Sequence, residues 1–232
     1  MNIIITGAGK GMGFELVKWF ALSGKHNIIA IARNEGAIEN LMNIPTANEC
    51  FIFPLQADLL ESNAIDHLIS FINSEKISID ILINNAGLMI KKPVNELSDE
   101  DFDLIFSTNV KTPFRLAREL LPFFNEHAHI VNIGSMGGFQ GSMKFNGLSL
   151  YSASKGALAI LSECLAEELK ERNIYVNCLA LGAVQTEMLG KTFPGYKAPV
   201  NADEIAKFIG EFALNGHKFV NGKIIPVSLT TP

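Results

Sequence analysis

Tyr151 and Lys155 have the residue types and the spacing of an acid–base site. They stand at i and i+4 at the start of a segment, 151–172, whose apolar periodicity predicts a helix. Side chains at this spacing share one helix face, so the ammonium can lie near the phenol. Tyrosine has an unperturbed pKa of about 10, and a nearby cation lowers it. The pair predicts a phenol that exchanges a proton, although an isolated pair of this kind is also common on ordinary helix faces.

A glycine-rich turn near the start of the chain could hold the phosphates of a dinucleotide. It follows a strand-like segment at 2–6 and opens a helix-like segment at 11–23. Glycines let backbone N–H groups approach a pyrophosphate, and the helix dipole favours negative charge there. A tight strand-to-helix turn without a ligand is the alternative. The cofactor contacts predicted in this turn are Gly7, Lys10, Gly11, Met12 and Gly13.

The end of the second predicted strand indicates which cofactor is preferred. NAD-binding chains usually place an acid there to accept from the ribose 2′-hydroxyl. Ala32 stands at that position, Arg33 follows it, and Lys10 lies in the glycine turn. Two cations without a carboxylate suit a 2′-phosphate, although Glu35 lies close by. NADP(H) is therefore favoured, and NAD(H) stays open.

The elements that must position these residues alternate regularly along the chain. Continuously apolar, β-branched strands are buried on both faces, which is typical of a parallel sheet flanked by helices. We predict a single Rossmann-fold domain over 1–232, of class α/β, with a doubly wound seven-stranded parallel sheet and helices on both faces. The strands are predicted near 2–6, 27–32, 50–56, 79–84, 128–134, 174–180 and 223–227, the helices at 11–23, 34–42, 61–74, 99–107, 110–125, 151–172 and 202–214, and a surface loop at 190–200.

The composition is that of an ordinary globular protein. The 232 residues are 48% hydrophobic and 19% charged, with a net charge of −5. Nucleic acids and anionic membranes select basic surfaces, so neither is an expected partner. No signal peptide or membrane span is recognised, and a cytoplasmic location is expected. The three cysteines are predicted to be buried reduced thiols, and the five histidines, without metal-ligand spacing, are assigned to the surface or to element ends, so no metal is expected.

Several short motifs occur in a fixed order: the turn TGxxxGxG at 6–13, Asn84-Asn85-Ala86-Gly87, Asn109, Ser135, and Tyr151 with Lys155. In this combination they resemble the short-chain dehydrogenase/reductase family, from residue 2 to about 188. The resemblance implies that Tyr151 exchanges the proton and Lys155 holds the nicotinamide ribose. It also implies that Ser135 binds the substrate oxygen and Asn109 holds a water near Lys155. The further cofactor contacts that it implies are Asp58, Leu59, Asn85, Ala86, Gly87, Tyr151, Lys155, Gly182, Val184 and Thr186.

Two departures from the family pattern concern the predicted site. The gap of 16 residues between Ser135 and Tyr151 is a few residues longer than usual, which makes Ser142 a second candidate for the carbonyl contact. Leu181 stands where the family usually has a proline before Gly182, which loosens a turn without removing a functional side chain.

Apolar side chains gather around the predicted substrate loop at 187–200. They predict a cleft for a hydrophobic or modest-sized carbonyl compound, with simple packing of the loop as the alternative. The candidates for this lining are Met89, Met136, Phe139, Met143, Phe145, Met188, Leu189, Phe193 and Tyr196.

Two functional classes stay open. The first is an NADP(H)-dependent oxidoreductase that acts on a carbonyl or alcohol, a 3-oxoacyl thioester among the candidates. The second is a nicotinamide-sensing binding protein of the same fold without turnover. The acid–base residues favour the enzyme, because a sensor has no chemical need for a tuned phenol. The predicted helices 110–125 and 151–172 are apolar on more than one face, and in the family they pair between subunits, so a homodimer or homotetramer is predicted.

Overall fold

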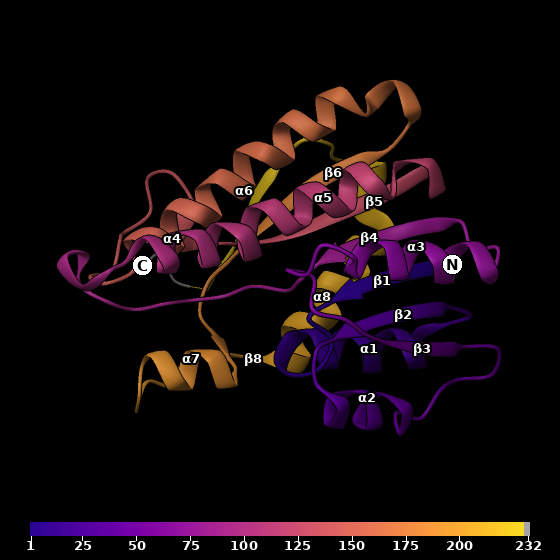
Figure 1. The fold of residues 1–232 in the computed structure, drawn as a ribbon, viewed down its shortest axis with the longest axis horizontal. Helices are drawn as coiled ribbons and strands as arrows, with labels where there is room; N and C mark the ends of the chain where they lie inside the picture. The colour runs from indigo at the N-terminus through magenta and orange to yellow at the C-terminus, as the bar shows by residue number, and fades with distance from the viewer. Residues whose placement is uncertain (230–232) are drawn as a thin grey trace.

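A seven-stranded parallel sheet forms the centre of the computed structural model, which describes residues 1–229. The strand order is β3-β2-β1-β4-β5-β6-β9, so the chain starts mid-sheet, moves outward, and returns to the other side of β1 (Figure 1). This confirms the predicted doubly wound Rossmann fold. The strands are β1 (Asn2–Thr6), β2 (Asn27–Ala32), β3 (Phe51–Gln56), β4 (Ile79–Asn84), β5 (Phe124–Ser135), β6 (Tyr175–Leu181) and β9 (Ile224–Val227).

Helices cover both faces of the sheet, as Figure 1 shows. Ile3 and Ile5 of β1 belong to the core beneath α1 and α8, whereas Ile4 between them belongs to the core beneath α3, α5 and α6. This alternation follows from the two-residue period of a strand and explains why both faces are apolar. No helix within residues 1–229 is long and apolar enough to cross a membrane. The helices are α1 (Gly11–Ser23), α2 (Glu35–Met42), α3 (Ala64–Ser74), α4 (Asp99–Phe106), α5 (Thr112–Glu119), α6 (Ser149–Glu168), α7 (Glu187–Thr192) and α8 (Ala202–Asn215).

The predicted helix at 110–125 is wrong at both ends. A π-helical turn at Ser107–Lys111 precedes α5, and α5 ends at Glu119. A short 3-10 turn, Leu121–Phe123, follows, and β5 begins at Phe124 rather than near 128. Pro122 has no N–H to continue the helical hydrogen bonds, which accounts for the early end.

The predicted surface loop at 190–200 is also partly wrong. Its first residues belong to α7, which Thr186 caps by accepting a hydrogen bond from the Leu189 N–H. Its last residue starts the short strand β8 (Val200–Asn201), which pairs with β7 (Val184–Gln185). In Figure 1, α7 lies apart from both helix layers. The segment is therefore part of a small ordered substructure, a short helix that lies between the paired strands β7 and β8 in the sequence.

Two assignments of single residue types need correction. Cys50 and Cys178 are buried as predicted, but Cys164 is exposed on α6, because the helix turns that position away from the sheet. His129 is buried within β5 rather than at the surface or at an element end, whereas His26, although buried, stands directly before β2, at an element end as predicted. The shared reason is that sequence periodicity does not show which polar positions of an element a neighbouring element covers.

His129 of β5 is held neutral by fixed partners. Its Nδ1 lies 3.0 Å from the carbonyl oxygen of Ala213, and its Nε2 lies 3.0 Å from the amide nitrogen of Asn177. The Asn177 oxygen accepts from the Lys223 N–H, so its amide nitrogen must face the ring and donate. Burial lowers the pKa of His129 from 6.5 to about 4.

We expect His129 to make the protein less stable in acid. Because its pKa is lower in the folded state, the unfolded chain takes up a proton first as the pH falls from 6.5 to about 4, and the free energy of unfolding drops by roughly 3 kcal/mol. Urea unfolding across this window measures the slope. The slope should shrink in His129→Gln and persist in His67→Gln, a change at an exposed position of α3. An undiminished slope in His129→Gln would contradict the assignment.

Candidate active site

The site begins between the carboxyl ends of β1 and β4, where the order in which the chain adds strands to the sheet reverses. Thr6 ends β1, and its hydroxyl oxygen accepts hydrogen bonds from the N–H groups of Asn85 at 3.1 Å and Ala86 at 3.0 Å. The Asn85 side chain donates in return to the carbonyls of Thr6 at 2.9 Å and Gly7 at 3.2 Å. The glycine turn that starts at Thr6 and the Asn84–Gly87 motif are therefore hydrogen-bonded to each other, at the place where ligands bind in sheets of this kind.

The glycine turn fits the phosphates of a dinucleotide. Gly7 and Gly11 have φ values of +66° and +55°, which favour glycine. A Cβ on Gly13 would lie 2.2 Å from the Gly7 carbonyl oxygen, so this position excludes any larger residue. The first turn of α1 has no acidic residue and no side-chain cap, which leaves its positive end available to an anion.

A groove of about 330 Å³ extends from this turn toward β2 and β3. Ala32 forms part of its wall, so no acid stands at the end of β2, as predicted. Most of the predicted cofactor contacts face this groove. They are Gly7, Lys10, Gly11, Met12, Arg33, Asp58, Leu59, Asn85, Ala86, Gly87 and Thr186.

Each of the two predicted phosphate-binding cations already has a carboxylate neighbour. Arg33 lies 3.8 Å from Asp58, and Lys10 lies 3.1 Å from Glu187 in α7. We expected Lys10 and Arg33 to have no carboxylate nearby, and this is wrong, because Glu187 and Asp58, which are distant in sequence, lie beside them in the fold. Both pairs are largely exposed, and exposed pairs of this kind are weak enough to exchange partners.

A second cavity, of about 460 Å³, adjoins the groove and shares Met12, Asn85, Gly87, Thr186 and Met188 with it. Seven of the nine predicted apolar lining residues are in its wall, whereas Phe139 and Met143 lie outside it. Most of its surface is apolar. Ser135, Tyr151, Lys155, Gly182 and Val184 complete the set of predicted site residues that it exposes.

Ser135 and Tyr151 face this cavity from different elements. Ser135 ends β5, and its hydroxyl accepts a hydrogen bond from the Gly137 N–H at 3.1 Å. Tyr151 lies in the first turn of α6. Burial raises the pKa of Tyr151, and a hydrogen bond with Ser135 lowers it by less. The predicted lowering by Lys155 is not found in this arrangement, where desolvation sets the direction of the shift and Ser135 is the group that opposes it.

Lys155 is a buried ammonium beside the same cavity. Its Nζ donates to the carbonyl oxygen of Ile133 in β5 at 2.7 Å. Burial lowers the pKa of Lys155 to about 8, and the nearby Cys178 opposes this shift. At neutral pH the group therefore stays mostly protonated while it can still lose its proton in mild base.

Asn109 lies in the π-helical turn between α4 and α5 and is buried. Its Oδ1 accepts from the Leu88 N–H at 2.8 Å, and its Nδ2 donates to the Leu88 carbonyl and to Ser154 Oγ, each at 2.9 Å. A Cβ on Gly87 would lie 3.4 Å from both Asn109 Oδ1 and Lys155 Nζ, so the two atoms flank this glycine. Such π-turns are frequent at functional sites.

Two further positions complete the comparison with the prediction. Ser142 turns its hydroxyl to the carbonyls of Met136 and Phe139 and is not part of the cavity wall, so it is no second carbonyl contact. Gly138 was missed, although a Cβ there would lie 2.5 Å from the backbone of Lys155 and Gly156. The Gly137-Gly138 pair after a strand was the available signal.

Comparison with known proteins agrees with this geometry. The sequence model of the short chain dehydrogenase family matches residues 1–197. The chain belongs to the short-chain dehydrogenase family. Members of this family are oxidoreductases that act on CH–OH or C=O groups, with small-molecule substrates.

Relatives of this dehydrogenase differ in their named substrates. The fatty acyl-CoA reductase of Acinetobacter baylyi is 33% identical over 82% of this chain, which spans only 64% of that protein. The 3-oxoacyl-(acyl-carrier-protein) reductase FabG of Escherichia coli is 27% identical over 97% of this chain and 94% of FabG. The solved structure of 4-hydroxyisoleucine dehydrogenase complexed with NADH is 29% identical, with a TM-score of 0.84 over 98% of this chain and 96% of that one.

Proposed function

We propose that this dehydrogenase transfers a hydride between NADP(H) and a hydrophobic carbonyl or alcohol substrate. The observation that carries the proposal is the shared wall of the two cavities. Ser135, Tyr151 and Lys155 line the apolar cavity, which meets the nucleotide groove along Asn85, Gly87 and neighbouring residues. A substrate in one cavity and a dinucleotide in the other would therefore be in contact.

A bound nicotinamide dinucleotide supplies or accepts the hydride. In reduction, Tyr151 Oη gives its proton to the substrate oxygen, and in oxidation it takes the proton back. Ser135 Oγ donates a hydrogen bond to the same oxygen and stabilises the charge that develops there. Lys155 contributes a buried positive charge to the wall of the same cavity, where low polarity strengthens its effect on charge that develops at the substrate oxygen. Asn109 holds the turn at Leu88 against α6, which keeps these groups in register.

The cavity supports a substrate with an apolar body and one reactive oxygen. Met89, Met136, Leu189 and Phe193 supply much of the apolar wall, and few fixed polar groups face them. A 3-oxoacyl thioester fits this description, and the acyl reductases among the relatives are consistent with it. Other hydrophobic ketones of similar size fit equally well.

NADP(H) is the proposed cofactor because Lys10 and Arg33 border the groove near Ala32. We expect Arg33→Ala to weaken NADPH binding by about tenfold to a hundredfold and NADH binding by less than about twofold, because charge-assisted hydrogen bonds reach only the 2′-phosphate. Titration of cofactor fluorescence measures both dissociation constants. Lys25→Ala, which removes an exposed cation paired with Glu49, is the control. Equal losses for the two cofactors would contradict the 2′-phosphate assignment.

We propose that the protein is a cytoplasmic homodimer or homotetramer. Each subunit would be one domain over residues 1–232, of which residues 230–232 lie outside the part that the structure describes. Exposed apolar side chains on three neighbouring helices support the assembly: Phe102 on α4, Phe114 on α5 and Ile160 on α6. Soluble proteins usually cover such groups when they gather on one face.

A further inference from the structure

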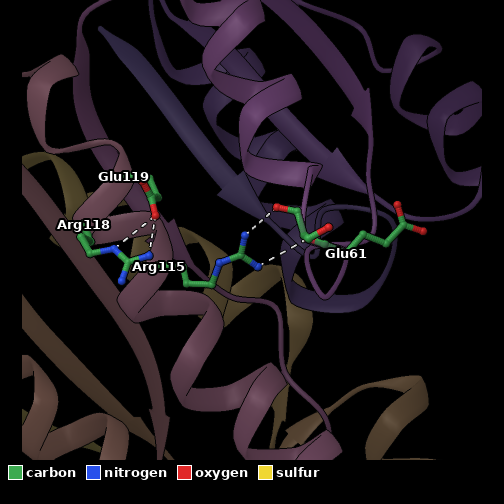
Figure 2. A network of polar contacts seen from close by, with 5 residues as sticks. Glu61, Arg115, Arg118 and Glu119 are labelled. Carbon is green, nitrogen blue, oxygen red and sulfur yellow. Dashed lines mark hydrogen bonds and ion pairs between the residues drawn. The ribbon is translucent and has the colours of Figure 1, made fainter.

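Arg115 of α5 reaches across to the segment between β3 and α3. Its Nη2 donates to the carbonyl oxygen of Ser62 at 2.9 Å, and its Nη1 donates to that of Glu61 at 3.4 Å. Figure 2 shows the guanidinium aimed at these two backbone oxygens and not at the Glu61 carboxylate. A planar fork of two N–H groups suits two successive carbonyls, so the contact fixes direction as well as distance.

The segment that Arg115 holds continues directly from one wall of the nucleotide groove. Ala57, Asp58, Leu59 and Leu60 line the groove, and Glu61 and Ser62 follow directly. The turn is tightly built: the Leu60 N–H donates to Asp58 Oδ1 at 3.1 Å, and the Glu61 N–H donates to the Asp58 carbonyl at 2.9 Å. A shift of Glu61 is therefore transmitted to Asp58 and Leu59.

The helix that carries Arg115 borders the same groove. Thr108 and Thr112, at the π-helical turn and at the start of α5, line it. Arg115 lies one turn beyond Thr112. The guanidinium thus connects two walls of the groove, the turn at 57–63 and α5, outside the space that a ligand would fill.

We propose that Arg115 is a positioning residue for the dinucleotide, acting through the turn at 57–63 and not by touching the ligand. It keeps Asp58 and Leu59 in place at the adenosine end of the groove. This inference rests on the proposed cofactor binding. It assigns to Arg115 an effect on affinity that NADPH and NADH share, because the adenosine is common to both.

Arg118 provides a matched control on the same helix. It lies one turn beyond Arg115, and its Nε donates to the Glu119 carboxylate at 3.2 Å (Figure 2). Its contacts are with Glu119 and with the ring of Phe114, both in α5, and not with the turn at 57–63. Arg118→Ala therefore removes the same charge and the same stem from α5 while leaving the turn untouched.

The experiment compares Arg115→Ala, Arg115→Lys and Arg118→Ala with the wild type. In Arg115→Ala we expect the Kd values of NADPH and NADH to rise together by about fivefold, the loss of one or two hydrogen bonds to a charged donor. Arg115→Lys should fall between, because an ammonium is a single donor point. Arg118→Ala should bind as the wild type does. The kcat at saturating cofactor should stay within about twofold in all of them, so the change appears in KM.

Amide hydrogen exchange tests the held turn without any cofactor. Exchange across 57–63 should become faster in Arg115→Ala and stay unchanged in Arg118→Ala. If the wild type binds either dinucleotide and both Arg115 variants bind it with the same Kd as the wild type, the proposal is wrong. A fall of kcat in step with the loss of affinity would also overturn it, since that indicates general damage. If the wild type binds neither dinucleotide, the proposed function fails as well. Faster exchange across 57–63 in Arg115→Ala would then show that Arg115 only stabilises the turn.

Discussion

Replacing Tyr151 with phenylalanine should lower kcat by about a thousandfold and change the affinity for NADPH by less than about twofold. The substitution removes one oxygen and keeps the ring, so the apolar cavity and the start of α6 stay packed. What is lost is the proton that the substrate oxygen needs as the hydride moves. Steady-state rates of NADPH oxidation, with a panel of ketones, aldehydes and acyl thioesters, measure kcat, and fluorescence titration measures binding.

Tyr196 offers the matched control for this substitution. It lines the same cavity, but the residue is half exposed, and it lies in the segment after α7 rather than beside Ser135. Tyr196→Phe should therefore keep kcat within about twofold. If Tyr151→Phe retained wild-type turnover, the proton donor would be another group. If the wild type bound NADPH but reduced no compound of the panel, the sensing protein would become the better description.

Gly138→Ala should separate the turn after β5 from α6. The added Cβ would lie 2.5 Å from both the Gly156 nitrogen and the Lys155 carbonyl carbon. These are backbone atoms, so no side chain can rotate away, and overpacking of this kind costs about 1–3 kcal/mol. We expect Tm to fall by about 5 °C and kcat to fall by at least about tenfold, because Ser135 and Tyr151 no longer share one geometry.

Gly36→Ala separates this steric effect from the general effect of adding a methyl group. Gly36 lies in α2, and a Cβ there meets nothing within 4 Å. Alanine favours the helix, so this variant should be as stable as the wild type or more stable by up to about 1 kcal/mol, with unchanged kcat. Wild-type Tm and kcat in Gly138→Ala would show that the turn and α6 can move apart freely, which would remove the proposed role of their contact. Thermal melts and steady-state kinetics are sufficient to decide.

The parts of the fold and site that could be predicted from the sequence are those set by short local motifs. Seven apolar strands with glycine turns specify a doubly wound sheet, because each strand is buried on both faces. The order of the glycine turn, Asn85, Ser135 and Tyr151 was enough to place them at one end of that sheet. Every predicted catalytic or cofactor-binding residue except Gly13 and Asn109 lines one of the two cavities.

The parts that could not be predicted depend on contacts between distant segments. The partners of Lys10 and Arg33 come from α7 and from the turn after β3, far away in the chain. The buried state of His129 depends on α8 and β6, which cover it from two sides. Local spacing carries no information about these approaches, and so it also missed the desolvation that raises the pKa of Tyr151.

The bonds between Asn85 and the glycine turn have a consequence for synthesis on the ribosome. The residues that these bonds join are separated by 79 and 78 positions in the sequence. β1 therefore cannot pair with β4 until that length of chain has emerged. Parallel pairings at this separation form slowly, because a long loop must close before any contact repays it. A nascent fragment that ends before β4 therefore contains the whole glycine motif but not the bonds that shape it. The shape of the glycine turn, on which the proposed nucleotide binding depends, is therefore not encoded in the first βαβ unit alone and is acquired only when β4 docks beside β1.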